Sequence, residues 1–258
     1  MNYYVLPNGR TVHCSNPVEA KYIYSEVFDE QVYTSNGITL KQDSVVFDVG
    51  ANIGLFSLYV LENYKNSQVY AFEPASHIYS FLKENTKDFS KRCKTYQAGL
   101  SNQETHATFY YYPNFPTFST FHLDSKGDKN RMANVVVDND LSKIDTAAAE
   151  LDTSNQLQPV EEKCKLLTLS SIIADEDIKQ IDLLKMDVQR AELYVLEGIN
   201  EKDWQKVKQI AFELHHIGEE QTKKIENLLS SQGFILQKYK DKFFEEDVPV
   251  YMMYATRQ

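Results

Sequence analysis

The stretch VVFDVGANIGLF, residues 45–56, joins a short apolar run to a turn that contains two glycines. The run VVFDV is rich in β-branched and aromatic residues, which favours a buried strand, and the residues after the turn have apolar side chains at helical spacing. Gly50 and Gly54 allow the backbone to turn sharply and to approach a ligand with no Cβ in between. The stretch predicts a strand, a turn and a helix, with a small-molecule site at the turn.

The same alternation of strands and helices continues along the chain. Further strands are predicted at residues 68–73, 94–100, 106–112, 182–188 and 209–215. Helical patterns are present at residues 53–64, 77–89, 191–199 and 220–233. Continuous apolar strands separated by helices are typical of a parallel sheet that is buried on both faces. The last two strands, 234–240 and 250–256, are joined only by a polar loop, so at least one of them is expected to be an antiparallel edge strand. The predicted fold class is α/β.

Two segments depart from this alternation, and they set the predicted domain organisation. Residues 1–44 are expected to form an N-terminal cap, and residues 45–258 a single domain. Within that domain, residues of about 113–164 are rich in Pro, Ser, Thr, Asp and Asn and show no clean period. Long insertions of this kind are often lids over a site. We therefore expect an inserted lid at the tips of the strands.

Charge and cysteine content exclude several classes of protein. The 258 residues carry a net charge of −10, which disfavours binding to nucleic acid and to anionic membranes. The three cysteines are far apart and lack C-x-x-C spacing, which argues against a disulfide framework and against a zinc site. The sequence shows neither a signal peptide nor an apolar run long enough to span a membrane. We expect a cytoplasmic protein without a nucleic-acid or membrane partner.

Acidic residues at the ends of two consecutive strands indicate which ligand the turn binds. Asp48 would repel a diphosphate and attract a sulfonium or ammonium group, and the G-x-x-x-G spacing differs from the dinucleotide fingerprint G-x-G-x-x-G. Glu73 ends the next strand, about 20 residues beyond the turn, where an acid suits hydrogen bonds to the two hydroxyls of a ribose. Pro74 then ends the strand. Together these features predict S-adenosylmethionine as the cofactor.

The segments FDVGANIG, YAFEP, AGLS, IDLLKMDVQRAELYVLEGI and IAFELHH occur in this order. With them the chain resembles the FkbM family of S-adenosylmethionine-dependent methyltransferases, most closely the O-methyltransferase subgroup associated with polyketide and nonribosomal peptide synthetases. The resemblance implies a Rossmann-like class I methyltransferase fold, with a seven-stranded, mostly parallel sheet and helices on both faces. It also implies a set of cofactor-binding residues, namely Asp48, Gly50, Asn52, Gly54, Glu73, Pro74, Gly99, Leu100, Ser101 and Asp187.

One departure from the family pattern bears on metal binding. The segment DVQRAE, residues 187–192, is the position compared. Family members usually show an acid followed by Gly or Lys there, as in DVEGAE, whereas this chain has Gln189 and Arg190. Asp187, Glu213 and His215 offer oxygen and nitrogen ligands that a hard cation accepts, but their spacing is generic and Gln189 removes a carboxylate. A divalent metal is therefore possible but not predicted, and no metal ligand is assigned.

Transfer of a methyl group to a hydroxyl needs a group that takes up the proton, and FELHH supplies candidates. Strand alternation places Glu213 and His215 on one face and His216 on the other. We predict His215 as the general base, because the pKa of histidine is near neutrality, with Glu213 orienting it or binding substrate. Asp187 is predicted to hold the acceptor, contact the methionine part of the cofactor or help bind an ion. The alternative is that the histidines only cap the following helix.

The predicted function is methylation of a hydroxyl on a small molecule, either free or tethered to an acyl or peptidyl carrier protein. Alternatives are a sugar hydroxyl or an amine as acceptor, and a cofactor-binding module without turnover, for which Gln189 is the main argument. Methylation of nucleic acid is disfavoured because a D/N-P-P-Y type of tetrapeptide is missing where MDVQR, residues 186–190, stands. The glycine spacing disfavours an NAD-dependent dehydrogenase.

Overall fold

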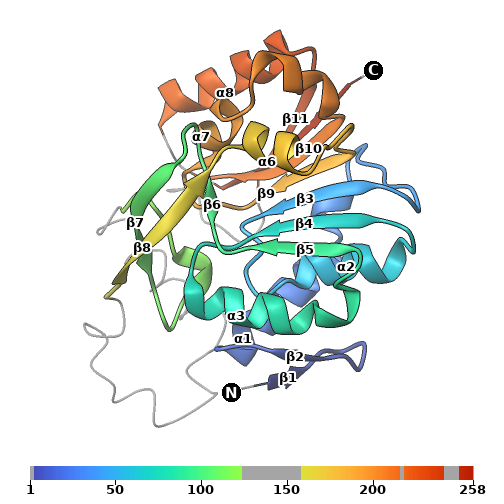
Figure 1. Cartoon of the computed structure of the whole chain (residues 1–258), viewed down its shortest axis with the longest axis vertical. Coiled ribbons are helices and arrows are strands. Elements are labelled where there is room, and N and C mark those ends of the chain that lie inside the picture. The colour runs from blue at the N-terminus through green and yellow to red at the C-terminus, as the bar shows by residue number, and fades with distance from the viewer. Residues whose placement is uncertain (1–2, 124–157, 216–217, 241–249, 258) are drawn as a thin grey trace.

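The computed structural model describes residues 3–123, 158–215, 218–240 and 250–257, and its centre is a seven-stranded sheet (Figure 1). The spatial order of the strands is β11-β12-β10-β9-β3-β4-β5. Strand β12 runs antiparallel to both of its neighbours, and the other pairs of this sheet are parallel. The bounds are β3 Val45–Val49, β4 Gln68–Phe72, β5 Cys93–Tyr96, β9 Leu183–Met186, β10 Gln209–Leu214, β11 Ile235–Lys240 and β12 Tyr251–Thr256.

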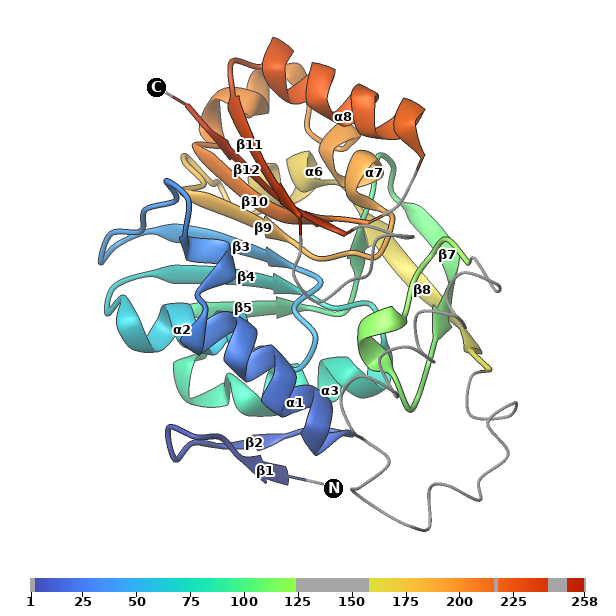
Figure 2. The ribbon, with the colours of Figure 1, turned by 180° about the vertical axis from the view of Figure 1, so that it is seen from behind.

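Helices cover both faces of this sheet, and the strand sequences explain why. Successive side chains of a strand point to opposite faces. Phe47 packs in one core cluster with helices α6, α7 and α8, whereas Val46 packs in another with helices α2 and α3 (Figure 2). The bounds are α2 Leu55–Asn63, α3 Ser76–Asn85, α6 Leu169–Asp175, α7 Glu192–Glu197 and α8 Glu219–Ser231. The predicted α/β fold, with a seven-stranded, mostly parallel sheet and helices on both faces, is confirmed.

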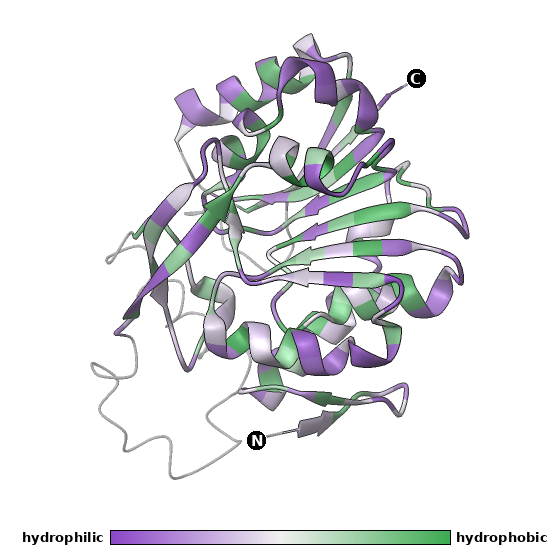
Figure 3. Ribbon diagram, in the orientation of Figure 1, coloured by the Kyte–Doolittle hydropathy of each residue, from purple (hydrophilic) through white to green (hydrophobic). Residues whose placement is uncertain are grey.

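Hydrophobic residues are concentrated in the central strands, which helices cover on both faces. Figure 3 shows hydrophobic colour along the central strands, which have helices on either side. Strand β9 is buried at each of its four positions, including Lys185. A strand that is apolar on both faces cannot lie at the surface, so the continuous apolar runs of the sequence specify a central position.

The end of the chain confirms the prediction of an antiparallel strand at the edge of the sheet. β11 lies at the edge and pairs antiparallel with β12, which lies between β10 and β11. After β10 the chain forms β11 at the edge of the sheet, and β12 then lies between β10 and β11. β12 is buried at four of its six positions, whereas β11 is mostly exposed, which agrees with an inner place for β12.

A second, three-stranded sheet lies at one end of the main sheet (Figure 1). It consists of β6 (Gly99–Leu100), β8 (Val160–Leu167) and β7 (Thr105–Tyr111), in that order, and β7 pairs antiparallel with β8. The sequence did not predict this separate sheet. Much of the predicted lid, residues 124–157, lies outside the described residues. The lid and the boundary at residues 44 and 45 therefore stay predictions.

The N-terminal residues form a hairpin and a helix. Strands β1 (Tyr3–Val5) and β2 (Thr11–His13) pair antiparallel, and helix α1 (Pro17–Tyr24) follows. The side chain of Asn16 accepts hydrogen bonds from the backbone N–H groups of Val18 and Glu19, which caps the helix. In the described ranges, every helix is too short or too polar to cross a lipid bilayer.

Candidate active site

A cavity lies at the carboxyl ends of β3, β4 and β9, where parallel α/β sheets bind their ligands. Its empty volume of about 570 Å³ includes space that is open to solvent. The walls come from the main sheet, from the three-stranded sheet and from residues 116–121. Of the predicted cofactor-binding residues, those that line it are Gly50, Asn52, Glu73, Pro74, Gly99, Leu100 and Asp187. Those that do not line it are Asp48, Gly54 and Ser101.

The turn after β3 is shaped by its glycines. Gly50 has a φ of 74°, and a Cβ at this position would lie 1.8 Å from the backbone oxygen of Asp187. No side chain fits in that space, so only glycine brings β3 and β9 so close at the cavity. Gly54 has a φ of 91°, and its missing Cβ leaves room for Leu82 of helix α3. Gly54 therefore serves helix packing, and its predicted contact with the cofactor stays a prediction.

Glu73 presents a buried carboxylate to the cavity. Its Oε1 accepts from the N–H of Ala75 at 2.9 Å, and its Oε2 accepts from the N–H of Asn52 at 3.0 Å. Only 7% of the residue is exposed, and burial raises the pKa of Glu73 to about 7, against the opposing effect of these two hydrogen bonds. The backbone thus fixes the orientation of the carboxylate, while its remaining lone pairs are available to ligand hydroxyls.

Asp48 lies behind the cavity rather than in its wall. It is fully buried, its Oδ1 lies 3.0 Å from Lys185 Nζ, and its Oδ2 accepts from the hydroxyl of Ser57 at 2.6 Å. Lys185 also donates to the backbone oxygen of Gly50 at 2.9 Å. In this structure Asp48 therefore supports the glycine turn through Lys185. Two neighbours hold its carboxylate, and its predicted direct contact with the cofactor stays a prediction.

Strand β6 contributes Gly99, which has no side chain, and the apolar side chain of Leu100 to the cavity wall. A Cβ on Gly99 would lie 2.7 Å from the ring of Phe121, which lines the same cavity and packs against Phe109 at 4.7 Å between ring centroids. Ser101 donates its backbone N–H to Leu167 and so joins the three-stranded sheet. Apolar and aromatic side chains line this part of the cavity, which suits a nucleobase.

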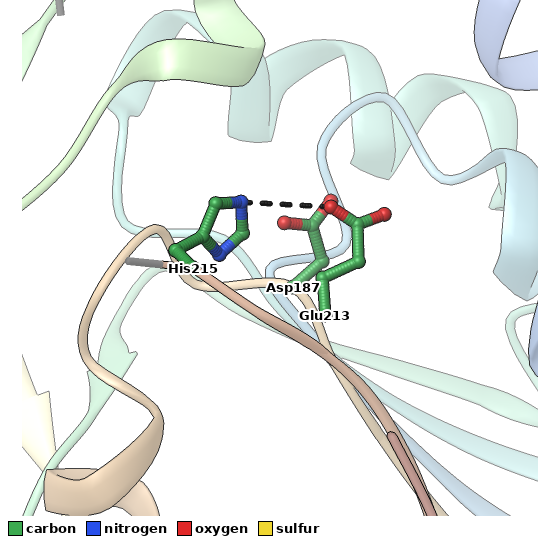
Figure 4. Close-up of side chains that lie close together, drawn as sticks. All are labelled: Asp187, Glu213 and His215. Atoms are coloured by element: carbon green, nitrogen blue, oxygen red, sulfur yellow. Dashed lines mark ion pairs between the residues drawn. The ribbon is translucent and has the colours of Figure 1, made fainter. Parts of the chain in front are cut away.

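Asp187, Glu213 and His215 come together at the ends of β9 and β10 (Figure 4). One ligand atom of each lies within 4.8 Å of the others, and His215 Nε2 is 3.5 Å from Glu213 Oε2. The hydroxyl of Tyr33 donates to Glu213 Oε1 at 2.7 Å. The structure thus unites the three residues predicted to be catalytic. Of these, Asp187 lines the cavity, and the other two lie directly behind it.

Glu192 is a further member of this cluster, and the sequence analysis assigned no role to it. Its Oε1 lies 2.7 Å from His215 Nδ1 and also accepts the N–H of Arg190 at 3.1 Å. The residue is fully buried at the start of helix α7. The sequence prediction gave the orienting role to Glu213, which is two residues from His215 in the strand. Sequence spacing did not reveal Glu192, because it lies 23 positions from His215 and on another element.

The departure from the family motif forms part of the cavity wall. Gln189 and Arg190 are consecutive residues with positive φ, 47° and 75°, and Gln189 lines the cavity. The backbone oxygen of Gln189 accepts from the hydroxyl of Thr120 at 2.6 Å, and Arg190 Nε donates to the backbone oxygen of His122 at 3.0 Å. These bonds hold a turn that ordinary residues adopt only at a cost in strain.

Helix α1 contacts the same wall. Glu19 Oε1 accepts from the backbone N–H of Thr117 at 2.7 Å, and Thr117 lines the cavity. Burial raises the pKa of Glu19 to about 7. Sequence reasoning did not name Glu19, since nothing in its local sequence links it to the distant segment at Thr117.

The cluster concentrates negative charge in a buried place. Burial, followed by the charges of Asp187 and Glu26, raises the pKa of Glu213 well above its ordinary value. Burial opposes protonation of His215, but the hydrogen bond and charge of Glu192, with the charges of Glu213 and Asp187, raise its pKa overall. Carboxylates around one imidazole can hold a divalent cation. Among the described residues Asp187, Glu213 and His215 form the group suited to a metal, and the structure does not test whether a divalent ion binds there.

These features fit the predicted cofactor. The cavity lies where parallel sheets bind their ligands, and the missing Cβ atoms of Gly50 and Gly99 let Asp187 and Phe121 form its wall. Glu73 is placed to accept from ribose hydroxyls. The acidic surroundings of Asp187 suit a ligand that carries positive charge, whereas a diphosphate would be repelled.

Comparison with known proteins agrees with this geometry. The Methyltransferase FkbM domain family matches residues 48–236. The chain is 34% identical to the AMB antimetabolite synthetase AmbE of Pseudomonas aeruginosa over 98% of its own length, and it spans 12% of that synthetase. It is 31% identical to the 31-O-demethyl-FK506 methyltransferase FkbM of Streptomyces tacrolimicus, with 93% of this chain and 91% of that protein covered.

A solved structure shares the fold. The methyltransferase FkbM from Methylobacillus flagellatus superposes with a TM-score of 0.54 at 14% identity, covering 89% of this chain and 47% of that one. The match to the family covers well over half of the chain, and it includes the cavity and the acidic cluster. The chain is therefore a methyltransferase that uses a cofactor of the S-adenosylmethionine type, and it belongs to the FkbM methyltransferase family.

Proposed function

We propose that this enzyme transfers a methyl group from S-adenosylmethionine to a hydroxyl oxygen of a natural-product intermediate. The observation that carries the proposal is the cluster of Asp187, Glu213 and His215 beside a cavity that suits the cofactor. A hydroxyl acceptor must lose its proton during transfer, and this cluster provides buried groups that can receive it.

The residues of the chain divide the work between binding and proton transfer. Glu73 accepts from the ribose hydroxyls, and Gly50 and Gly99 leave room for Asp187 and Phe121 in the cavity wall. When bound, S-adenosylmethionine supplies a methyl carbon whose bond to positively charged sulfur breaks, with the electron pair left on sulfur, as the acceptor oxygen bonds to it. Asp187 faces the acceptor, and His215 receives the proton. Positioning supplies much of the acceleration in such a displacement.

The protonation state of His215 depends on the charges around it. In the free protein the surrounding carboxylates favour the protonated imidazole of His215. A positively charged ligand in the adjacent cavity would oppose that protonation, because like charges repel each other. His215 would then be in the neutral form that accepts a proton.

The name of one relative supports an oxygen acceptor. One relative is named as a methyltransferase of 31-O-demethyl-FK506, and another as an antimetabolite synthetase. This chain spans 12% of the latter. A substrate attached to an acyl or peptidyl carrier protein is consistent with a methyltransferase unit that occurs within a synthetase.

Mass spectrometry of methyl transfer tests the proposal. The purified chain is incubated with S-adenosylmethionine and a panel of alcohols, sugars and amines, free and linked to a carrier protein. A gain of one methyl group on a hydroxyl supports the proposal. Transfer to amines alone overturns the oxygen acceptor, and cofactor binding without transfer to any class favours a module without turnover.

A further inference from the structure

Buried carboxylates surround His215 on more than one side, and they do not contact it equally. Glu192 Oε1 lies 2.7 Å from Nδ1, whereas Glu213 Oε2 lies 3.5 Å from Nε2. The first distance is that of a strong hydrogen bond to a charged acceptor, and the second is at the limit of any hydrogen bond. The short contact decides which ring nitrogen carries a proton in the neutral imidazole.

We propose that Glu192 is the positioning residue of the active site, which keeps a proton on His215 Nδ1 and leaves Nε2 facing Asp187 and Glu213 as the proton acceptor. The inference rests on the proposed function, because it assigns the partner of the proposed base. It also replaces Glu213, which the sequence prediction named, with a residue on a different element.

Independent features of the structure support this role. Glu192 is fully buried, and the N–H of Arg190 binds the same oxygen, Oε1, that faces His215. The carboxylate is thus held in one orientation from the backbone of the preceding turn. Glu213 is differently engaged, because its Oε1 accepts the hydroxyl of Tyr33 at 2.7 Å. Of the two carboxylates, Glu192 is therefore the one whose hydrogen bond is directed at the imidazole.

The proton transfer that this arrangement serves is balanced. The proton of the acceptor hydroxyl moves to Nε2, and the O–H electron pair stays on the oxygen. The resulting imidazolium has a proton on each ring nitrogen, and Glu192 compensates its charge through the Nδ1–H bond. Asp187 and Glu213 face the other side of the ring, and they contribute charge but no hydrogen bond at a normal distance to Nδ1.

Nuclear magnetic resonance of the full chain, labelled with ¹⁵N at histidine, tests the proposal without knowledge of the acceptor. The signal of His215 is assigned by its loss in His215→Ala. We expect neutral His215 to carry its proton on Nδ1. In Glu192→Gln, the pKa of His215 should fall by about 1 to 3, because a neutral amide replaces an adjacent negative charge. Glu192→Asp should recover part of the change.

Glu213→Gln is the matched control, because it also removes one buried carboxylate next to the ring. It should leave the proton of neutral His215 on Nδ1. Binding of S-adenosylhomocysteine by each variant confirms an intact fold. A proton on Nε2 in the wild type overturns the proposal, and so does a Glu192→Gln variant whose His215 titrates as in the wild type. Methyl transfer is scored separately, so failure on hydroxyls would affect the proposed function and leave this result interpretable.

Discussion

A glycine with a backbone neighbour in the place of its missing side chain makes the sharpest prediction at the residue scale. Gly50→Ala would put a Cβ 1.8 Å from the Asp187 oxygen at a φ of 74°. The left-handed backbone and the forced displacement together should lower the free energy of unfolding by about 2 to 5 kcal/mol. Urea denaturation measures this loss.

Gly9→Ala is the control for backbone strain alone. Gly9 has a φ of 85°, and a Cβ there would meet no atom within 4 Å. This variant should lose about 1 to 2 kcal/mol and should bind S-adenosylhomocysteine normally. Equal losses in both variants would show that the close approach of Gly50 to Asp187 has no energetic consequence.

Glu73 makes cofactor affinity depend on pH. The pKa of this carboxyl is about 7 in the free protein, so its charged form, the better acceptor for ribose hydroxyls, predominates above that pH. Affinity for S-adenosylhomocysteine, measured by calorimetry, should rise as the pH increases through 7. Glu73→Gln should bind about 10- to 100-fold more weakly at pH 8 and show a flat profile.

The stability of the free protein should fall as the pH rises, whereas cofactor affinity should increase. A folded-state pKa above the unfolded value of 4.5 means that the protonated carboxyl favours the folded state below pH 4.5, and that this contribution is lost as the pH rises through about 7. Glu73→Gln carries no ionisable group at this position, so this fall in stability between pH 4.5 and about 7 should be missing from its profile. Glu104→Gln, at an exposed position, should leave both profiles unchanged; a similar effect from both variants would contradict the assignment.

At the element scale, the pairing of β3 with β9 depends on a buried ion pair. Asp48 and Lys185 face each other in the register of the two strands, and their side chains are 0% and 5% exposed. Lys185→Met leaves an uncompensated buried carboxylate and should cost about 3 to 5 kcal/mol in urea denaturation. The double variant with Asp48→Asn should recover much of this loss. Strictly additive effects would contradict a coupled pair.

The strands and helices show which parts of the structure local sequence determines. VVFDV was predicted as a strand, and β3 occupies the same residues, Val45–Val49. The helix pattern at residues 191–199 is also confirmed, as α7. These elements form predictably because each carries a continuous apolar pattern of its own period.

Features that depend on long-range pairing could not be predicted in this way. β12 lies inside the sheet because of its partners β10 and β11, and its own sequence does not specify them. The contact between Glu192 and His215 and the ion pair of Asp48 with Lys185 also depend on residues that are far apart in the sequence. The sequence identified Asp187, Glu213 and His215 as a group because they follow neighbouring parallel strands, whose ends meet at one edge.

At the scale of the whole molecule, a chelator and a metal titration test whether methyl transfer needs a divalent cation. The ligand atoms of Asp187, Glu213 and His215 lie within 4.8 Å of one another. Because His215 acts as a base in our account, we expect methyl transfer to be unchanged by a chelator. Calorimetry with Mn²⁺ should detect no binding that depends on His215. Loss of activity with the chelator, restored by a divalent cation, would contradict this expectation.

The net charge of −10 and the acidic cavity together favour a cationic ligand over a dinucleotide. The central claim is that the cavity between Gly50 and Glu73 holds the methyl donor. Calorimetric titration of the full chain with S-adenosylhomocysteine and, separately, with NAD tests it most directly. Our account predicts one site for S-adenosylhomocysteine, greatly weakened in Gly50→Ala, and no binding of NAD. Binding of NAD, or S-adenosylhomocysteine binding that Gly50→Ala leaves intact, would contradict it.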